Sequence, residues 1–215
     1  SQVWGYVASP TVVPPHEDVI RTAFIYRLDS VRPEGPSLIL MDDAYANARQ
    51  PLAQKFVAKD VRGSFVTVAN HFKSKGSGED DGTGQGKSNP SRTAQAQALI
   101  DWSAKEFAGE PVFLLGDFNA YGMEDPVMKI KDAGYTEVVE QLAPGASTFQ
   151  YGGRLGSLHH IFANAAAMRM VHGAGVWDIN ADESIAMQYS RRNYNVTYFH
   201  TSGPWAASDH DPALA

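Results

Sequence analysis

Two short polar segments contain residue types that can hold a metal ion or move a proton. In the segment GDFNA, Asp117 offers a hard anionic oxygen to a divalent metal, and the Asn119 amide can donate to a phosphate oxygen or ligate through its carbonyl. In the segment SDHDP, near the end of the sequence, the Asp209 carboxylate stands beside the His210 imidazole. Structural explanations stay open for both, because an Asx turn that caps a strand uses the same residue types as GDFNA.

A third candidate is His71, which lies at the end of the apolar run 64–72. Asp117 follows the apolar run 112–115, so both residues are expected at strand ends. If the two strands are parallel neighbours, these ends meet at one edge of a sheet. A single histidine at a strand end is more often structural, but polar groups at several strand ends favour a catalytic site.

The chemistry that suits these residues is the hydrolysis of a phosphate ester. A carboxylate-bound divalent ion neutralises charge on the phosphate, one imidazole removes a proton from water, and a second imidazole donates to the leaving group or to a non-bridging oxygen. Hard oxygen ligands in a chain without cysteine suit Mg²⁺, Mn²⁺ or Ca²⁺ better than Zn²⁺. The sequence has no glycine-rich P-loop and no GxSxG motif, which excludes the P-loop NTPase and α/β-hydrolase classes.

The elements that must position these residues alternate between strand and helix. The runs 19–26 and 64–72 are apolar on both faces, as expected of central strands, and 112–115 is a short buried strand. Residues 91–107 predict a helix, with Asn89 as its N-cap and Pro90 in its first turn. Its apolar stripe consists of Ala96, Leu99, Ile100, Ser103 and Phe107. Strand, helix and strand in this order predict a mixed α/β sheet.

The composition is that of an ordinary globular protein. The sequence has 215 residues, is 43% hydrophobic and carries a formal net charge of −6 from 18 basic and 24 acidic residues. The acidic balance argues weakly against a protein that binds nucleic acid by phosphate neutralisation alone. No run approaches the roughly 20 apolar residues that span a bilayer, and neither a repeat nor a shift in composition divides the chain. We therefore expect a single domain over residues 1–215 without a membrane span.

Five motifs in order resemble the endonuclease/exonuclease/phosphatase superfamily, and within it the bacterial extracellular DNases most. They are NHFKSK at 70–75, SRTAQA at 91–96, GDFNA at 116–120, GSLHH at 156–160 and SDHDP at 208–212, supported by WDINADE at 177–183. The resemblance implies a DNase I-like fold of the α/β (α+β) class, a two-layer β-sandwich flanked by helices. It also implies that a strand-helix unit with a metal-binding glutamate precedes the first residue, so that the fold is incomplete at the N-terminus. Glu17, in a loop-like segment, is a poor replacement for that glutamate.

The resemblance also implies roles for individual residues. His71 assists at the scissile phosphate, Asp117 and Asn119 orient the phosphate and contribute to the metal site, Asp209 is a metal ligand, and His210 is the general base. The expected ion is Mg²⁺ or Mn²⁺, with Ca²⁺ as a further candidate. His159, expected to contact the substrate, stands where the family usually has an aspartate, and this replacement changes charge, hydrogen bonding and metal preference at once.

Residues beyond the motifs leave alternatives open. Arg92, at the predicted helix N-terminus, either contacts a substrate phosphate or is a solvated first-turn residue. Several cations and tyrosines either line a groove that follows a phosphate backbone or are ordinary solvated surface: Lys73, Lys75, Arg92, Arg154, Arg191, Arg192, Tyr151 and Tyr194. The polar segment 76–89 is more often a solvated loop than a cation site.

The leading hypothesis is a metal-dependent phosphodiester hydrolase, an extracellular endonuclease that acts on DNA, with RNA as a second candidate. It is expected to be a monomer with no protein partner. His159 and the glutamate expected before residue 1 motivate a second hypothesis, a catalytically silent relative that binds nucleic acid or phosphate. A third hypothesis keeps the enzyme and changes the substrate to a lipid headgroup or a small phosphate ester, since related sites differ mainly in their loops.

Overall fold

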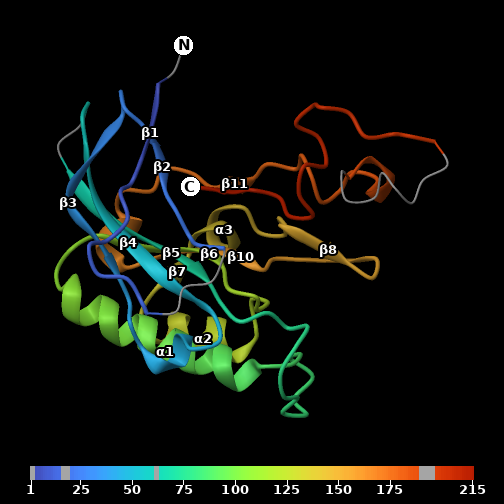
Figure 1. Cartoon of the computed structure of the whole chain (residues 1–215), viewed down its shortest axis with the longest axis horizontal. Coiled ribbons are helices and arrows are strands. Elements are labelled where there is room, and N and C mark those ends of the chain that lie inside the picture. The colour runs from blue at the N-terminus through green and yellow to red at the C-terminus, as the bar shows by residue number, and fades with distance from the viewer. Residues whose placement is uncertain (1–2, 16–19, 61–62, 189–196) are drawn as a thin grey trace.

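A computed structural model of the chain describes residues 3–15, 20–60, 63–188 and 197–215 (Figure 1). Its centre is a six-stranded sheet with the strand order β3-β4-β5-β6-β10-β7. These strands are β3 (Val31–Ile39), β4 (Arg49–Ala58), β5 (Ser64–His71), β6 (Val112–Asp117), β10 (His159–Ala163) and β7 (Thr136–Glu137). Strands β5 and β6 are parallel, and the other neighbouring strands pair antiparallel.

The parallel pair is connected by helix α1 (Asn89–Glu106), as the sequence predicts. The predicted stripe faces the core, where Ala96, Leu99 and Ser103 are buried. The cap prediction is wrong by one residue, because Ser88 is the N-cap and Asn89 is the first helical residue. The Asn89 side chain donates instead to two carboxylates, those of Asp81 and Asp125.

The two faces of the sheet carry separate apolar cores. Helices α1 and α2 (Asp125–Asp132) cover one face, where Val66, Val68 and Leu114 meet Leu99 (Figure 1). On the opposite face, α3 (Val138–Leu142) and α4 (Ala165–Met168) pack around the alternate residues of β6 and β10. This second layer also contains the two-stranded sheet of β11 (Gly175–Val176) and β12 (Ala213–Leu214). The mixed sheet flanked by helices confirms the predicted fold class.

One strand prediction needs correction. The run 19–26 was expected to be a central strand, but β2 (Ile25–Arg27) is short and pairs with β1 (Trp4–Tyr6), and Ile25 is 72% exposed. β-Branched and aromatic residues indicate a strand without fixing its place in the sheet. The strand beside β5 within the central sheet is β4, whose buried Gln54 donates a hydrogen bond of 2.8 Å to the Lys55 carbonyl.

Four smaller elements complete the described chain. They are η1 (Asp43–Tyr45), the hairpin of β8 (Phe149–Tyr151) and β9 (Arg154–Gly156), and η2 (Ile185–Met187). The hairpin extends away from the central sheet (Figure 1). None of the helices in the described ranges is long and apolar enough to cross a membrane.

Candidate active site

Three adjacent strands bring His71, Asp117 and His159 side by side. His71 is the last residue of β5 and pairs with Asp117, the last residue of β6, while His159 begins β10 and pairs with Asp117 from the other side. Paired residues on neighbouring strands point to the same face of a sheet. The three side chains therefore form one row at the sheet edge, which we call the edge row. The predicted meeting of the His71 and Asp117 strand ends is confirmed.

Local backbone geometry fixes Asp117 in this row. Gly116 has φ +130°, and a Cβ at this position would lie 2.1 Å from the Asn70 carbonyl oxygen, so only glycine allows the two strand ends to come this close. One Asp117 oxygen, Oδ1, accepts a 2.8 Å hydrogen bond from the Asn119 backbone N–H, which is the Asx turn. The other, Oδ2, lies 3.7 Å from His71 Nε2. The turn and the site therefore use different oxygens of one carboxylate.

His210 reaches the edge row from the C-terminal segment. Its ring lies between His159, at a centroid distance of 4.4 Å and 32° tilt, and Phe149, at 4.7 Å and 18°. The ring atom Nδ1 of His210 is buried and has no hydrogen-bond partner among the described residues. A buried polar atom without a partner is uncommon in folded proteins and is often associated with a functional role.

The next residue, Asp211, anchors this segment. Its buried carboxylate oxygen Oδ1 accepts hydrogen bonds from three consecutive backbone N–H groups, those of residues 179, 180 and 181, at 3.0, 2.7 and 3.1 Å. The Asp211 carbonyl lies 3.3 Å from His159 Nδ1. Since a carbonyl only accepts, Nδ1 of His159 carries the proton and the lone pair is on Nε2.

The environment of His159 favours its neutral form. Burial of the ring, and then the nearby His210, lower the pKa of His159 below its ordinary value of 6.5, against the opposing effect of Asp117. A neutral imidazole can ligate a metal ion or accept a proton, whereas an imidazolium can do neither.

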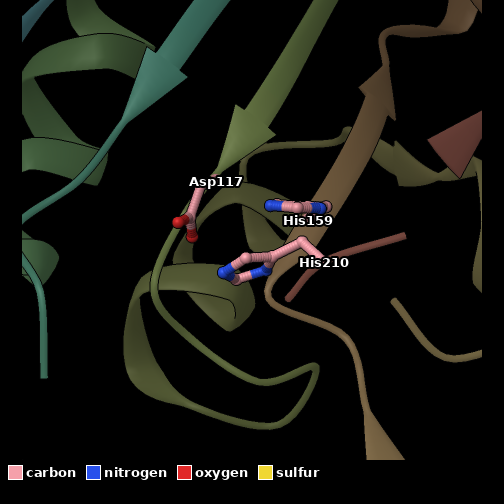
Figure 2. Close-up of side chains that lie close together, drawn as sticks. All are labelled: Asp117, His159 and His210. Carbon is pink, nitrogen blue, oxygen red and sulfur yellow. The ribbon is translucent and has the colours of Figure 1, made fainter. Parts of the chain in front are cut away.

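Asp117, His159 and His210 point toward one another (Figure 2). One ligand atom from each lies within 4.8 Å of the others, and this is the one cluster of three metal-binding side chains found among the described residues. Of the two carboxylates predicted as metal ligands from the sequence, Asp117 belongs to this cluster and Asp209 does not. The Asn119 amide donates to the Phe72 carbonyl at 3.1 Å, and the Asp209 side chain is 70% exposed, 3.7 Å from His210 Nε2. The residues present fit a metal ion through one oxygen and two nitrogens.

The structure corrects the prediction for Arg92. Its side chain is 0% exposed, so it is neither solvated nor available to a substrate. Its guanidinium donates to the carbonyls of Lys73, Gln85 and Lys87, at 3.3, 3.1 and 2.6 Å. Arg92 thus connects the segment after β5 to the loop before α1.

Two further residues stand beside the site without a sequence signal that indicates them. Arg49 of β4 pairs with His71 and extends the edge row by one strand, with a side chain that is partly buried. Phe149 supplies the ring on which His210 stacks. The pairing register of β4 with β5 could have indicated Arg49, but the sequence does not predict β4.

A column of aromatic rings leads from the edge row to the surface. The His159 and His210 rings are followed by Phe149 and then by Tyr151, which stacks on Phe149 at 6.2 Å and 12°. Tyr151 is 74% exposed and pairs with Arg154 in the hairpin. We call these rings the aromatic column. The predicted groove residues Arg191, Arg192 and Tyr194 lie outside the described residues.

Comparisons with known proteins find similarity in structure only. No protein-family model and no curated protein matches the chain. An endonuclease/exonuclease/phosphatase from Bacteroides vulgatus is 16% identical with a TM-score of 0.55, over 88% of this chain and 67% of that protein. D. rerio TDP2, complexed with single strand DNA product, is 14% identical with a TM-score of 0.54, over 86% and 71%.

A mannosyl-6-phosphatase from Bacteroides thetaiotaomicron is 15% identical with a TM-score of 0.52, over 80% of this chain and 64% of that protein. The chain spans only 60%, 57% and 53% of the length of three other matched structures. These similarities confirm the predicted resemblance at the level of the fold, while the closer relation to extracellular DNases stays a prediction. The chain has the fold of the endonuclease/exonuclease/phosphatase proteins.

Proposed function

We propose that the protein hydrolyses phosphodiester bonds in nucleic acid, with DNA as the expected substrate, and that the reaction takes place at the edge row. The observation that carries this proposal is the convergence of Asp117 with the imidazoles of His71, His159 and His210 at one end of the sheet. Titratable groups that meet at the edge of a sheet are typical of hydrolytic sites, and the fold is one in which phosphoesterases are known.

The reaction forms a bond from a water oxygen to phosphorus and breaks the bond from phosphorus to the leaving oxygen. Water loses a proton and the leaving oxygen gains one. We assign His71 to the proton transfer at the leaving oxygen. Its Nε2 lies 3.7 Å from Asp117 Oδ2, and its side chain points to the same face of the sheet as that of Asp117. Arg49, opposite His71 in β4, adds positive charge beside the phosphate.

Asp117, His159 and His210 would hold a divalent ion in this proposal. When bound, the ion supplies Lewis acidity and neutralises charge that develops on the phosphate. His210 then contributes a ligand atom in place of the general-base role expected from the sequence. Asp211 keeps both imidazoles in position, through its anchored backbone and its carbonyl contact with His159.

The aromatic column favours nucleic acid over a small phosphate ester. Exposed Tyr151 offers a flat surface on which an unpaired base can stack, and such stacking contributes about 1–3 kcal/mol per base. A matched structure, D. rerio TDP2, contains a single strand DNA product, which supports the same substrate class. The monomeric state and the extracellular location stay predictions.

A substrate panel tests this function. The chain is incubated with duplex DNA, single-stranded DNA, p-nitrophenyl phosphate and a phosphocholine ester, each with added divalent ions and with EDTA. We expect cleavage of DNA that EDTA abolishes. Turnover of p-nitrophenyl phosphate or of the phosphocholine ester without cleavage of DNA would contradict the nucleic-acid assignment and support the small-ester alternative.

A specific observation also favours the silent binding relative. His159 is an imidazole where the resemblance implies a carboxylate, and the buried His210 Nδ1 beside it has no hydrogen-bond partner among the described residues, while the Asp209 carboxylate lies 3.7 Å from the other ring nitrogen, Nε2. This alternative predicts that the chain binds DNA without cleaving it under any ion. Binding measured by fluorescence anisotropy, alongside the cleavage assay, separates the two functions.

A further inference from the structure

We propose that Asp117, His159 and His210 form a centre that prefers a nitrogen-binding divalent ion of the Zn²⁺ type over the Mg²⁺, Mn²⁺ or Ca²⁺ expected from the sequence. The inference deepens the proposed function and rests on it only for the role of the ion in hydrolysis. Binding of the ion is a separate property of these residues.

The donor set supports this preference. Two imidazole nitrogens and one carboxylate oxygen lie within 4.8 Å of one another. Imidazole is a ligand for Zn²⁺, Cu²⁺, Fe²⁺ and Ni²⁺, whereas Mg²⁺ and Ca²⁺ take oxygen ligands almost exclusively. Of the other predicted oxygen donors, Asn119 donates through its amide nitrogen to the Phe72 carbonyl, and the Asp209 carboxylate is 70% exposed and is not part of the cluster.

The outer contacts of His159 are those of a metal ligand. Ligating histidines usually donate their second ring N–H to a carbonyl or a carboxylate, which fixes the tautomer and the ring orientation. His159 does so through Nδ1 to the Asp211 carbonyl at 3.3 Å. Asp211 is itself immobilised by three backbone N–H groups on its carboxylate and by its own N–H, which donates to the Thr148 carbonyl at 2.9 Å. These contacts therefore fix the orientation of the His159 ring and of the lone pair on Nε2.

The second imidazole is equally confined. His210 is packed between the His159 and Phe149 rings, and its backbone carbonyl accepts a 2.9 Å hydrogen bond from the Asn180 side chain. Confinement of both rings keeps the ligand atoms close without an ion. Three protein ligands are the number found in catalytic zinc sites, which keep a further position open for water or substrate.

A titration with Co²⁺, a spectroscopic substitute for Zn²⁺, tests the centre without any measurement of hydrolysis. The full chain is used without a histidine tag, because a tag would bind Co²⁺. We expect visible absorption typical of a four- or five-coordinate ion, saturation at one equivalent, and displacement by Zn²⁺ but not by a large excess of Mg²⁺. The absence of such absorption, or displacement by Mg²⁺ as effective as by Zn²⁺, would overturn the proposal.

The variant His159→Asp restores the carboxylate that the resemblance implies. We expect it to weaken Zn²⁺ binding at least about tenfold, the lower end for changes around a metal site, and to improve Mg²⁺ binding. The control His172→Asp makes the same chemical change at an exposed histidine and should leave Zn²⁺ binding unchanged. Equal Zn²⁺ affinity of His159→Asp and the parent chain would contradict the proposal.

Thermal unfolding of both variants shows whether they remain folded. If His159→Asp does not fold, His159→Gln in the same titration replaces it and should also lose the Co²⁺ absorption. Binding of Zn²⁺ by a chain that cleaves no DNA would overturn the proposed function and leave the metal centre intact. Cleavage of DNA with Mg²⁺ alone, without Zn²⁺ binding, would do the reverse.

Discussion

Two regions of the molecule contain polar side chains that the sequence predicts to be functional, and these side chains have different roles in the two regions. Around Arg92, a buried guanidinium donates to three loop carbonyls. At the edge row and the adjacent His210, some polar atoms make no hydrogen bond to the residues that the structure describes. Asp117 uses only one carboxylate oxygen in its turn, and His210 Nδ1 is buried without a partner in the described part of the chain. The first region connects loops to the fold, and the second is where we propose that a metal ion binds.

The hydrogen bonds of a polar residue in this fold distinguish a structural role from a chemical one. A buried polar group whose hydrogen bonds go to backbone carbonyls is accounted for by stability, because leaving these carbonyls unpaired costs free energy. A group that is held rigidly by its neighbours but keeps a free lone pair or oxygen is a candidate for metal binding or catalysis. Arg92 and His159 began as similar candidates in the sequence and separate on this criterion.

The largest effect is expected for Asp117→Asn. Loss of the carboxylate removes a proposed metal ligand and the partner of His71, so the rate of DNA cleavage should fall about a hundredfold or more. The amide oxygen can still accept from the Asn119 N–H, so the free energy of unfolding should change by less than about 1 kcal/mol. Cleavage kinetics and urea unfolding measure the two quantities. If Asp117→Asn cleaves DNA at the parent rate, the reaction does not take place at the edge row.

Arg92→Met should have the opposite pattern. The methionine keeps an apolar stem but leaves three carbonyls without charged donors, so the free energy of unfolding should fall by about 3 kcal/mol. The cleavage rate per folded molecule should stay within about threefold of the parent. The exposed control Arg154→Met should change stability by less than about 0.5 kcal/mol. Loss of activity in an Arg92→Met protein that is as stable as the parent would contradict the purely structural role assigned to Arg92.

Tyr151→Ala tests the aromatic column. Removal of the exposed ring should raise the KM for single-stranded DNA about tenfold, in line with one lost stacking contact, without a similar change for a small diester that has no base. Tyr151→Phe keeps the ring and should behave like the parent. Equal effects of Tyr151→Ala on both substrates would show that the hairpin supports the fold of the site and does not bind bases.

The smallest effect is expected for Asp209→Asn. The carboxylate is 70% exposed and lies outside the cluster of Asp117, His159 and His210, so the cleavage rate should stay within about threefold of the parent. A loss greater than about thirtyfold, with Zn²⁺ binding weakened as well, would return Asp209 to the ligand role predicted from the sequence and revise the metal centre.

Much of the scaffold of the site could be predicted from the sequence because it is local. The run 64–72, the helical stripe and the run 112–115 each carry their own periodicity, and together they predict the parallel pair β5 and β6 and the meeting of His71 with Asp117. The motif around His159 was identified only by resemblance. Its pairing with Asp117 depends on the antiparallel register of β10, which no local pattern indicates.

The remainder depends on contacts between distant segments. The sequence shows only the position of Arg92 in the first turn of its helix, which allows either a phosphate contact or a solvated side chain, whereas the carbonyls that it binds belong to other segments. Phe149 and Asp211 support His210 and His159 through the hairpin and the C-terminal turn. The proposed metal preference differs from the sequence prediction for the same reason: Asp117, from β6, clusters with two histidines that come from other segments of the chain.

The most direct test of the central claim, that phosphodiester hydrolysis takes place at the edge row, is the rate of DNA cleavage by the ion-loaded chain compared with His71→Ala. His71 lies outside the proposed metal cluster, so its loss separates proton transfer from ion binding. We expect cleavage by the parent chain, a rate about 10²–10⁴-fold lower in His71→Ala, and unchanged Co²⁺ absorption in the variant. Cleavage at equal rates, or no cleavage by a folded and ion-loaded parent chain, would contradict it.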